Sequence, residues 1–188
     1  MNNAPIGIFD SGIGGITILN SIKKILPKES IIYYSDNYNS PYGNKSKKEI
    51  EKLSIKNTEF LIEKGCKIIV VACNTATTNC ISKLRTNFDL PFIGVEPAIK
   101  PAAMQTKSGL IGVLATKGTL SSGLFEKTAN NYASDVKVIE KNATGLVELI
   151  EKGTFSGEKI ENILKKNLNP MIQNKIDHLV LGCTHYPI

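Results

Sequence analysis

The chain has 188 residues, which is enough for one substantial α/β unit or for two small halves with a cleft between them. Hydrophobic residues make up 41% and charged residues 21%, as in ordinary globular proteins, and the net charge of +6 comes mostly from scattered lysines. The sequence has neither a run of like charge nor basic residues interleaved with aromatic ones, so nucleic acid is not an expected partner.

The N-terminus has no basic segment followed by an apolar one, and no apolar run approaches the length of a membrane span. We therefore expect a cytoplasmic protein with no membrane partner. Its four cysteines, at positions 66, 73, 80 and 183, should then stay reduced. They form no C-x-x-C pair and are accompanied by only two histidines, so no metal site is predicted.

Short β-branched runs alternate with amphipathic segments along the chain, which is typical of parallel βαβ units. Most of the predicted strands are apolar on both faces, as in a sheet that helices cover on each side. The strands are predicted at Ile6–Phe9, Ile31–Ser35, Ile68–Ala72, Phe92–Val95, Leu110–Leu114, Val136–Glu140 and His178–Leu181. Helices are predicted at Ile16–Leu26, Lys47–Lys64, Thr75–Thr86, Leu120–Tyr132 and Gly157–Leu168, the last with Ser156 as its N-cap and Glu158 in its first turn.

A weak internal sequence repeat suggests two related halves. Ile69–Thr75 has the sequence IVVACNT and Leu179–His185 has LVLGCTH, each an apolar strand followed by a small residue, a cysteine and a polar pair. Two prolines interrupt the pattern near Glu96–Pro101. We therefore predict an α/β fold of two similar parallel-sheet αβα halves, residues 1–96 and 97–188, with the active site in the cleft between them.

Ligands of open parallel sheets bind beyond the carboxyl ends of the strands. Five clusters of polar and glycine residues follow predicted strands and should lie on one edge: Asp10–Gly15, Asp36–Asn44, Cys73–Thr75, Ala115–Thr119 and Cys183–Pro187. The cluster Asp10–Gly15 lacks the glycine spacing of a dinucleotide-binding or phosphate-binding loop. Its backbone amides, at the start of a predicted helix, could bind one carboxylate. Asp10 in this turn could be only a helix cap, or could also orient an ammonium group or tune a thiol.

Free cysteines are usually buried and behave as small hydrophobes, which is the interpretation for Cys66 and Cys80. Cys73 and Cys183 differ because each ends a strand at the functional edge, where nearby helix amides would lower the thiol pKa. Two such thiols on opposite sides of a substrate could remove a proton from an amino-acid α-carbon on one face and return one on the other. Asn74, Thr75 and Thr184 could donate hydrogen bonds to substrate carboxylates, and His185 could assist Cys183.

Two other interpretations of this pair stay open. The cysteines could form a redox disulfide, although they lie 183 − 73 = 110 residues apart. One of them could be the nucleophile of a thiol hydrolase with His185 as its base. The residues alone favour the proton-transfer pair only slightly.

Five segments together resemble bacterial glutamate racemase of the aspartate/glutamate racemase superfamily. They are Asp10–Gly15 (DSGIGG), Pro41–Gly43 (PYG), Ala72–Thr77 (ACNTAT), Gly94–Ala98 (GVEPA) and Leu181–Pro187 (LGCTHYP). The resemblance runs from Ile6 to Pro187 and implies a cofactor-independent enzyme that supplies D-glutamate for peptidoglycan. It also implies that family members continue for several dozen residues beyond Ile188, in a segment that completes the first half.

Carried over to these positions, the resemblance implies two groups of site residues. The catalytic group is Cys73, Cys183, Asp10, Glu151 and His185. The substrate-binding group is Asp10, Ser11, Pro41, Tyr42, Gly43, Asn74, Thr75, Thr116, Thr119, Thr184 and His185. Glu151 enters only by resemblance, since its own pattern is that of a solvated helix residue.

Glutamate is the partner that the resemblance implies. An aspartate or other amino-acid racemase and a non-catalytic binder of acidic amino acids stay as alternatives. A homodimer is a further expectation, although no feature of the sequence decides the oligomeric state.

Overall fold

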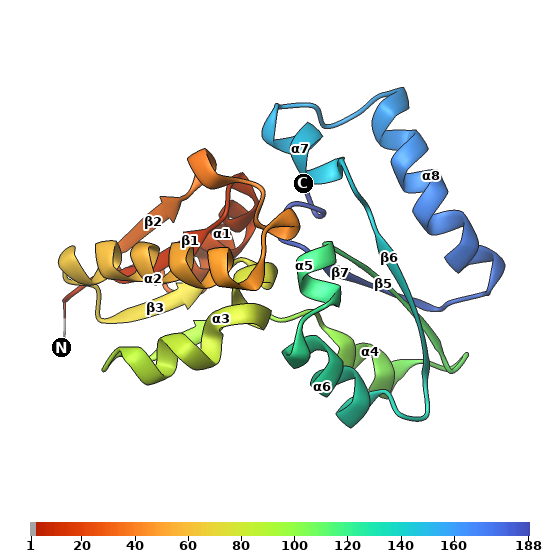
Figure 1. Cartoon of the computed structure of the whole chain (residues 1–188), viewed down its shortest axis with the longest axis horizontal. Coiled ribbons are helices and arrows are strands. Elements are labelled where there is room, and N and C mark those ends of the chain that lie inside the picture. The colour runs from red at the N-terminus through yellow and green to blue at the C-terminus, as the bar shows by residue number, and fades with distance from the viewer. Residues whose placement is uncertain (1–2) are drawn as a thin grey trace.

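The computed structural model describes residues 3–188 and contains two separate parallel sheets (Figure 1). The first sheet has the order β2-β1-β3-β4, with strands β1 (Ile6–Asp10), β2 (Ile31–Ser35), β3 (Ile68–Val71) and β4 (Phe92–Gly94). The second has the order β6-β5-β7, with strands β5 (Leu110–Ala115), β6 (Lys137–Asn142) and β7 (His178–Gly182). All neighbouring strands are parallel. The predicted α/β fold with two parallel-sheet halves is therefore confirmed.

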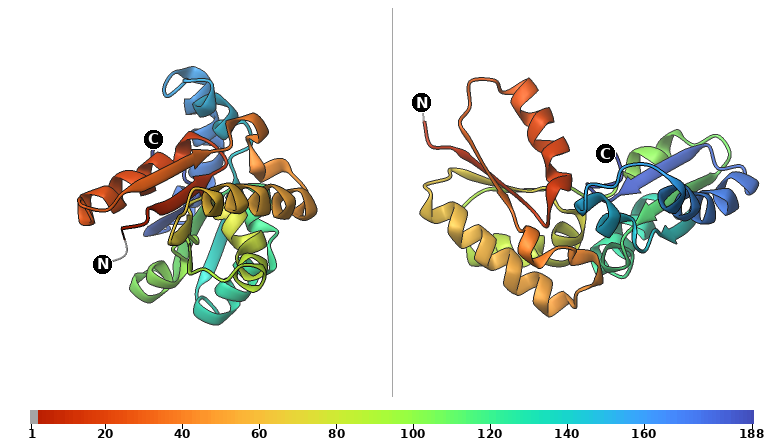
Figure 2. Two further views of the ribbon diagram at one scale, coloured as in Figure 1. Left: turned by 90° about the vertical axis from the view of Figure 1, so that its left-hand side faces the viewer. Right: turned by 90° about the horizontal axis from the view of Figure 1, so that it is seen from above.

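Helices cover both faces of each sheet (Figure 2). The first half contains α1 (Ile16–Ile25), α2 (Lys47–Glu63) and α3 (Asn74–Asn87). The second contains α4 (Ile99–Gln105), α5 (Lys117–Leu120), α6 (Gly123–Tyr132), α7 (Leu146–Glu151) and α8 (Glu158–Gln173). Short 3₁₀ helices lie at Ile13–Gly15, Asn37–Asn39 and Tyr42–Asn44.

The alternation of side chains along the strands builds a core on each face. In the first half, Ile8 and Val70 point toward the apolar side of α1, whereas Phe9 and Val71 pack with residues of α2 and α3. In the second half, Val113 packs in a cluster with residues of α4 and α6, while the opposite face packs against α7 and α8. Each half is thus an αβα layer whose strand ends can carry a site.

Several helix predictions need correction. The predicted helix Leu120–Tyr132 begins later, at Gly123 as α6, because the Ser122 hydroxyl accepts the amide of Phe125 there, and Leu120 instead ends the short helix α5. The N-cap of α8 is Gly157, whose φ of 102° favours glycine, and not Ser156. The same helix does not stop at Leu168 but continues to Gln173 through Pro170.

Two short helices, α4 and α7, lie entirely outside the predicted set, and α5 lies outside it except for Leu120. Pro101, an apparent interruption in the sequence pattern, lies in the first turn of α4. Backbone amides in the first turn of a helix have no intrahelical acceptor, so proline is tolerated there. The residues between β4 and α4 connect the two sheets, and the boundary at residues 96 and 97 remains a prediction. Within residues 3–188, none of the helices is long and apolar enough to cross a membrane.

Candidate active site

Residues from both halves meet around one small cavity at the carboxyl ends of the strands. Its volume is about 10 Å³. It is lined by Ser11, Pro41, Tyr42, Gly43, Cys73, Asn74, Thr75, Thr116, Val147, Cys183, Thr184 and His185. The structure therefore brings both candidate cysteines to one cavity, together with nine other residues predicted for the site. Three predicted residues, Asp10, Thr119 and Glu151, do not line it and lie behind those that do.

Cys73 is placed by the turn from β3 into α3. It is the N-cap of α3, where its Sγ accepts the amide of Ala76 at 3.4 Å and lies 3.6 Å from the Ser11 hydroxyl. Burial, followed by the negative charge of Asp10, raises the pKa of this thiol to about 12, although the hydrogen bonds from Ala76 and Ser11 oppose the shift. The predicted lowering of its pKa is therefore wrong, because desolvation outweighs the helix amides.

Cys183 follows β7 and is also buried, at 7% exposure. Its Sγ lies 3.7 Å from Nδ1 of His185. Burial raises the pKa of this thiol well above its ordinary value, the charges of Cys73 and Asp10 act in the same direction, and the backbone amide of His185 opposes them. The predicted lowering is wrong here as well. In this closed arrangement both sulfur atoms are thiols near neutral pH.

Asp10 lies at the end of β1 and is fully buried. Its Oδ2 accepts the amides of Gly12 and Gly15 at 3.2 and 3.1 Å, and its Oδ1 accepts the Thr184 hydroxyl of the other half at 3.1 Å. Burial raises the pKa of the carboxyl, while the charge of His185 and these hydrogen bonds lower it. Asp10 thus binds amides of the turn before α1 without being the N-cap residue of a helix, and a second contact joins it to the segment that follows Cys183.

A hydrogen-bonded chain crosses between the halves behind His185. His185 is 1% exposed, and its Nε2 makes a short contact with Oε1 of Glu151. The same oxygen accepts the amide of Ile13 in the first half at 2.9 Å. The Glu151 side chain is only 16% exposed, so its interpretation as a solvated helix residue is wrong. Its partners are 34 and 138 residues away in sequence, which no local pattern reveals.

The hydroxyl groups of three threonines, contributed by both halves, are hydrogen-bonded to one another beside the cavity. Thr75 Oγ1 lies 2.8 Å from Thr116 Oγ1 and 3.1 Å from Thr119 Oγ1. Thr119 is completely buried behind the other two. Next to them the Asn74 side chain donates to the carbonyl of Val95 at 3.0 Å, in the connection between the sheets. Thr75 and Thr116 can bind a carboxylate directly, whereas Thr119 can only orient them.

The loop Pro41–Gly43 is held by a buried polar network that the sequence did not reveal. Tyr42 is 1% exposed, and its hydroxyl donates to Asp36 and accepts from Nδ2 of Asn57 at 2.9 Å. The next residue, Gly43, packs directly on the second half, since a Cβ there would lie 2.6 Å from Cβ of Thr116. The loop is therefore anchored in the first half and touches the second.

The two remaining cysteines lie away from this cavity. Cys66 packs beside Gly7 of β1, and Cys80 lies in α3 within the hydrophobic core of the first half. All four cysteines are free thiols. Among residues 3–188, no group of three or more histidine, cysteine, aspartate and glutamate side chains could hold a metal ion.

Comparisons with known proteins agree on one family. The family model described as Asp/Glu/Hydantoin racemase matches residues 7–188. A glutamate racemase of Herpetosiphon aurantiacus is 46% identical over 187 residues, which cover 100% of this chain and 74% of that protein.

Solved structures give the same result. The glutamate racemase of Escherichia coli, in complex with L-glutamate and the activator UDP-MurNAc-Ala, matches with a TM-score of 0.87 and 37% identity over 98% of this chain and 71% of its own. The glutamate racemase of Francisella tularensis, in complex with D-glutamate, matches with a TM-score of 0.85 and 34% identity over 100% of this chain and 71% of its own.

Proposed function

Because the chain belongs to the Asp/Glu/hydantoin racemase family, we propose that it interconverts L-glutamate and D-glutamate by proton transfer between Cys73 and Cys183. The reaction needs no cofactor in this scheme, and its D-glutamate would serve peptidoglycan synthesis. Membership of the family supports the reaction class, and the names of the similar proteins support glutamate as the substrate.

One observation carries the proposed mechanism. Cys73 and Cys183 follow strands of two different sheets and line the same cavity, which is also lined by hydroxyl-bearing residues of both halves, among them Ser11 and Thr116. Racemisation needs an acid and a base on opposite faces of the α-carbon, because a single base tends to return the proton to the face it came from. Two thiols supplied by two halves meet that requirement, and a hydrolase would leave one of them without a task.

The proposed reaction conserves protons and electrons. The thiolate of one cysteine takes the α-proton and becomes a thiol, leaving the C–H electron pair on the α-carbon. The thiol of the other cysteine then gives its proton to the opposite face and becomes the thiolate. The enzyme ends ready for the reverse reaction. By resemblance to the family, Cys73 would act on D-glutamate and Cys183 on L-glutamate.

Neighbouring groups would prepare the thiols and hold the substrate. The hydroxyls of Ser11, Thr75 and Thr116 can donate to the two carboxylates, whereas the Thr184 hydroxyl beside them donates to Asp10. The substrate ammonium would favour a thiolate by bringing a positive charge close to the buried sulfur atoms, whose pKa values burial and the charge of Asp10 raise. Glu151 would keep His185 oriented toward Cys183, since it binds the opposite nitrogen of the ring.

The decisive experiment replaces each cysteine in turn. Cys73→Ala and Cys183→Ala should each abolish the interconversion of glutamate enantiomers, followed by circular dichroism, because each variant lacks one of the two bases. Cys80→Ala is the matched control, since this buried thiol does not line the cavity, and it should keep turnover. Retained turnover in both active-site variants would overturn the mechanism.

Two further measurements separate the alternatives. Incorporation of deuterium from solvent at the α-carbon is expected for a racemase and excludes a protein that only binds acidic amino acids. Turnover on aspartate, compared with glutamate, tests the side-chain length. A covalent acyl adduct on either cysteine, without α-carbon exchange, would instead favour a thiol hydrolase.

A further inference from the structure

A partly buried tyrosine beside the site has no part in the proposed proton transfer. Tyr33 lies on β2, on the face of the sheet that packs against α1. Its hydroxyl donates to the carbonyl of Gly12 at 2.7 Å, in the turn between β1 and α1. Burial, followed by the charge of Asp10, raises the pKa of this hydroxyl, whereas a hydrogen bond with Ser35 lowers it. The hydroxyl therefore stays protonated near neutral pH and acts as a donor, not as a third base.

The turn that this hydroxyl holds also contacts two other groups of the first half. The Ser11 hydroxyl lies 3.6 Å from Sγ of Cys73. The amide of the next residue, Gly12, donates to Oδ2 of Asp10 at 3.2 Å. A shift of this turn would therefore be felt on the Cys73 side of the cavity.

The peptide unit between Gly12 and Ile13 is held from both halves. Its carbonyl oxygen accepts the Tyr33 hydroxyl, and its N–H donates to Oε1 of Glu151 at 2.9 Å. The carboxylate lies directly against the turn, since a Cβ at Gly12 would overlap the same oxygen. Because a peptide unit is planar, a tilt at its carbonyl end also moves its N–H. The Tyr33 hydroxyl therefore helps to fix the hydrogen bond that Glu151 accepts.

This hydrogen bond leads on to the second cysteine. The oxygen of Glu151 that accepts the Ile13 amide also contacts Nε2 of His185. The other ring nitrogen of His185, Nδ1, lies 3.7 Å from Sγ of Cys183. A displaced Ile13 amide would move the carboxylate, and with it the imidazole ring beside the thiol.

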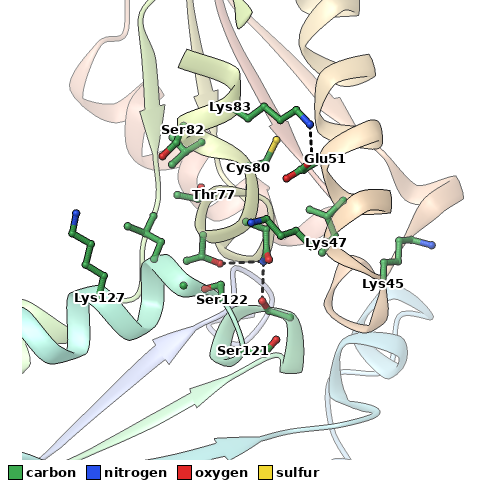
Figure 3. Close-up of a pocket in the computed structure, with 17 residues that line it drawn as sticks. Lys45, Lys47, Glu51, Thr77, Cys80, Ser82, Lys83, Ser121, Ser122 and Lys127 are labelled. Atoms are coloured by element: carbon green, nitrogen blue, oxygen red, sulfur yellow. Dashed lines mark hydrogen bonds and ion pairs between the residues drawn. The ribbon is translucent and has the colours of Figure 1, made fainter. Parts of the chain in front are cut away.

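The threonines proposed to bind the substrate carboxylates are held from a different direction. Asn79 of α3 lines a separate hollow of about 580 Å³, which Figure 3 shows. Its Nδ2 donates to the carbonyl of Thr75 at 2.9 Å and to that of Gly118, in the second half, at 2.8 Å. The Thr75 hydroxyl lies 2.8 Å from that of Thr116. These contacts run through α3 and α5 and not through the turn after β1, so loss of the Tyr33 hydroxyl should leave them in place.

We propose that Tyr33 is a positioning residue, whose hydroxyl holds the Gly12–Ile13 peptide against Glu151 and so keeps His185 beside Cys183. Its effect on turnover rests on the proposed racemase function, whereas its coupling to Glu151 does not. The hydroxyl should therefore matter for the rate of the reaction and much less for the binding of glutamate.

Kinetics of Tyr33→Phe, which removes the hydroxyl and keeps the ring, test the effect on rate. We expect kcat for glutamate to fall at least about tenfold, because catalytic groups lose their alignment when displaced by about 1 Å. KM should change less than about threefold, because Thr75 and Thr116 keep their partners. The matched control is Tyr34→Phe, the next residue of β2, whose side chain points to the opposite face and packs against Phe60. That variant should change neither quantity.

Urea unfolding tests the coupling without any turnover. Tyr33→Phe is made in the original chain and in the Glu151→Ala variant, and the shift of the unfolding midpoint is compared. We expect the shift to be at most about half as large in the Glu151→Ala chain, because the effects of coupled groups are not additive. Tyr34→Phe should shift the midpoint equally in the two chains, since its side chain packs in the core on the other face of the sheet.

Three results would overturn the proposal. They are a kcat of Tyr33→Phe equal to that of the original chain, an equal loss of kcat in Tyr33→Phe and Tyr34→Phe, and equal midpoint shifts by Tyr33→Phe in the two chains, which would show that the hydroxyl only stabilises the first half. If the original chain does not racemise glutamate, the proposed function fails, and the midpoint shifts alone decide whether Tyr33 acts on Glu151. If it racemises glutamate and Tyr33→Phe is unimpaired, the proposed function stands and the role of Tyr33 fails.

Discussion

At the scale of single residues, the state of the two thiols decides when the site can work. Burial and the charge of Asp10 raise the pKa of Cys73 to about 12, so the thiolate is scarce near neutral pH and grows as pH rises. The kcat/KM for D-glutamate, which reports the free enzyme, should therefore rise about tenfold per pH unit between about pH 7 and about pH 9.

The measurement is a pH profile of kcat/KM for D-glutamate, with the fold checked by circular dichroism at each pH. Because the proposed base is the thiolate, a raised pKa places the rise on the alkaline side. A profile that bends over at about pH 8.5 to 9 would contradict this, since it would mean that the thiol ionises near its ordinary pKa of about 8.5.

Tyr42 gives a second residue-scale prediction. Tyr42→Phe removes the hydroxyl that bridges Asp36 and Asn57, and so leaves buried polar groups short of a partner. We expect a loss of about 1–3 kcal/mol in the free energy of unfolding. We also expect a several-fold higher KM for glutamate, because the loop Pro41–Gly43 lines the cavity.

Urea denaturation and steady-state kinetics measure the two effects. Tyr38→Phe is the matched control, because the Tyr38 side chain is 97% exposed and should change neither quantity. A loss of stability with an unchanged KM would show that the network supports the fold but does not position the loop.

At the scale of elements, the turn between β1 and α1 depends on a close approach at Gly14. A Cβ at this position would lie 2.6 Å from Nδ1 of His185, 2.6 Å from Oγ1 of Thr184 and 2.7 Å from the backbone nitrogen of His185. Gly14→Ala should therefore push the segment after β7 away from the first half. We expect kcat for glutamate to fall at least about tenfold, because catalytic groups lose their alignment when displaced by about 1 Å.

Kinetics and thermal unfolding of Gly14→Ala separate a displaced site from a failed fold. Gly123→Ala is the control, since a Cβ there meets nothing within 4 Å and the residue begins α6. That variant should keep both its activity and its unfolding temperature. Full activity in Gly14→Ala would show that the two halves adapt to the added methyl group.

The elements also show what a sequence pattern can and cannot locate. All seven predicted strands are present with small shifts at their ends, because buried parallel strands are short β-branched runs with distinct borders. The helices α4 and α7 have seven and six residues, too few for a helical period to be recognised. Pro170 does not end α8, so tertiary packing overrides a local signal there.

The candidate site divides in the same way. The residues that line the cavity could be predicted because the carboxyl ends of parallel strands meet at one edge. The groups behind them could not, since Glu151 reaches Ile13 across 138 residues and Asn57 reaches Tyr42 from the middle of a helix. The direction of the thiol pKa shifts could not be predicted either, because it depends on how deeply the fold buries each sulfur atom.

At the scale of the whole molecule, the closed contact between the halves limits entry to the cavity. A volume of about 10 Å³ leaves room for about one water molecule, whereas small-molecule sites have several hundred Å³. Contacts from Glu151 to Ile13 and from Thr184 to Asp10 join the halves at this point. We therefore expect the proposed substrate to enter when the halves separate and these hydrogen bonds break.

Amide hydrogen exchange at Ile13 should report this opening directly. The amide of Ile13 is protected by Glu151 of the other half, whereas the amide of Ala72 is bonded to Phe9 within the first sheet. We expect Ile13 to exchange much faster than Ala72, because separation of the halves costs less free energy than unfolding the sheet. Saturating D-glutamate should slow exchange at Ile13, since a ligand held by both halves opposes their separation, and also at Ala72, since unfolding of the sheet releases the ligand too. Equal rates at the two amides would mean that the halves open only when the whole chain unfolds, and substrate would then have to enter by a motion of the loop Pro41–Gly43 alone.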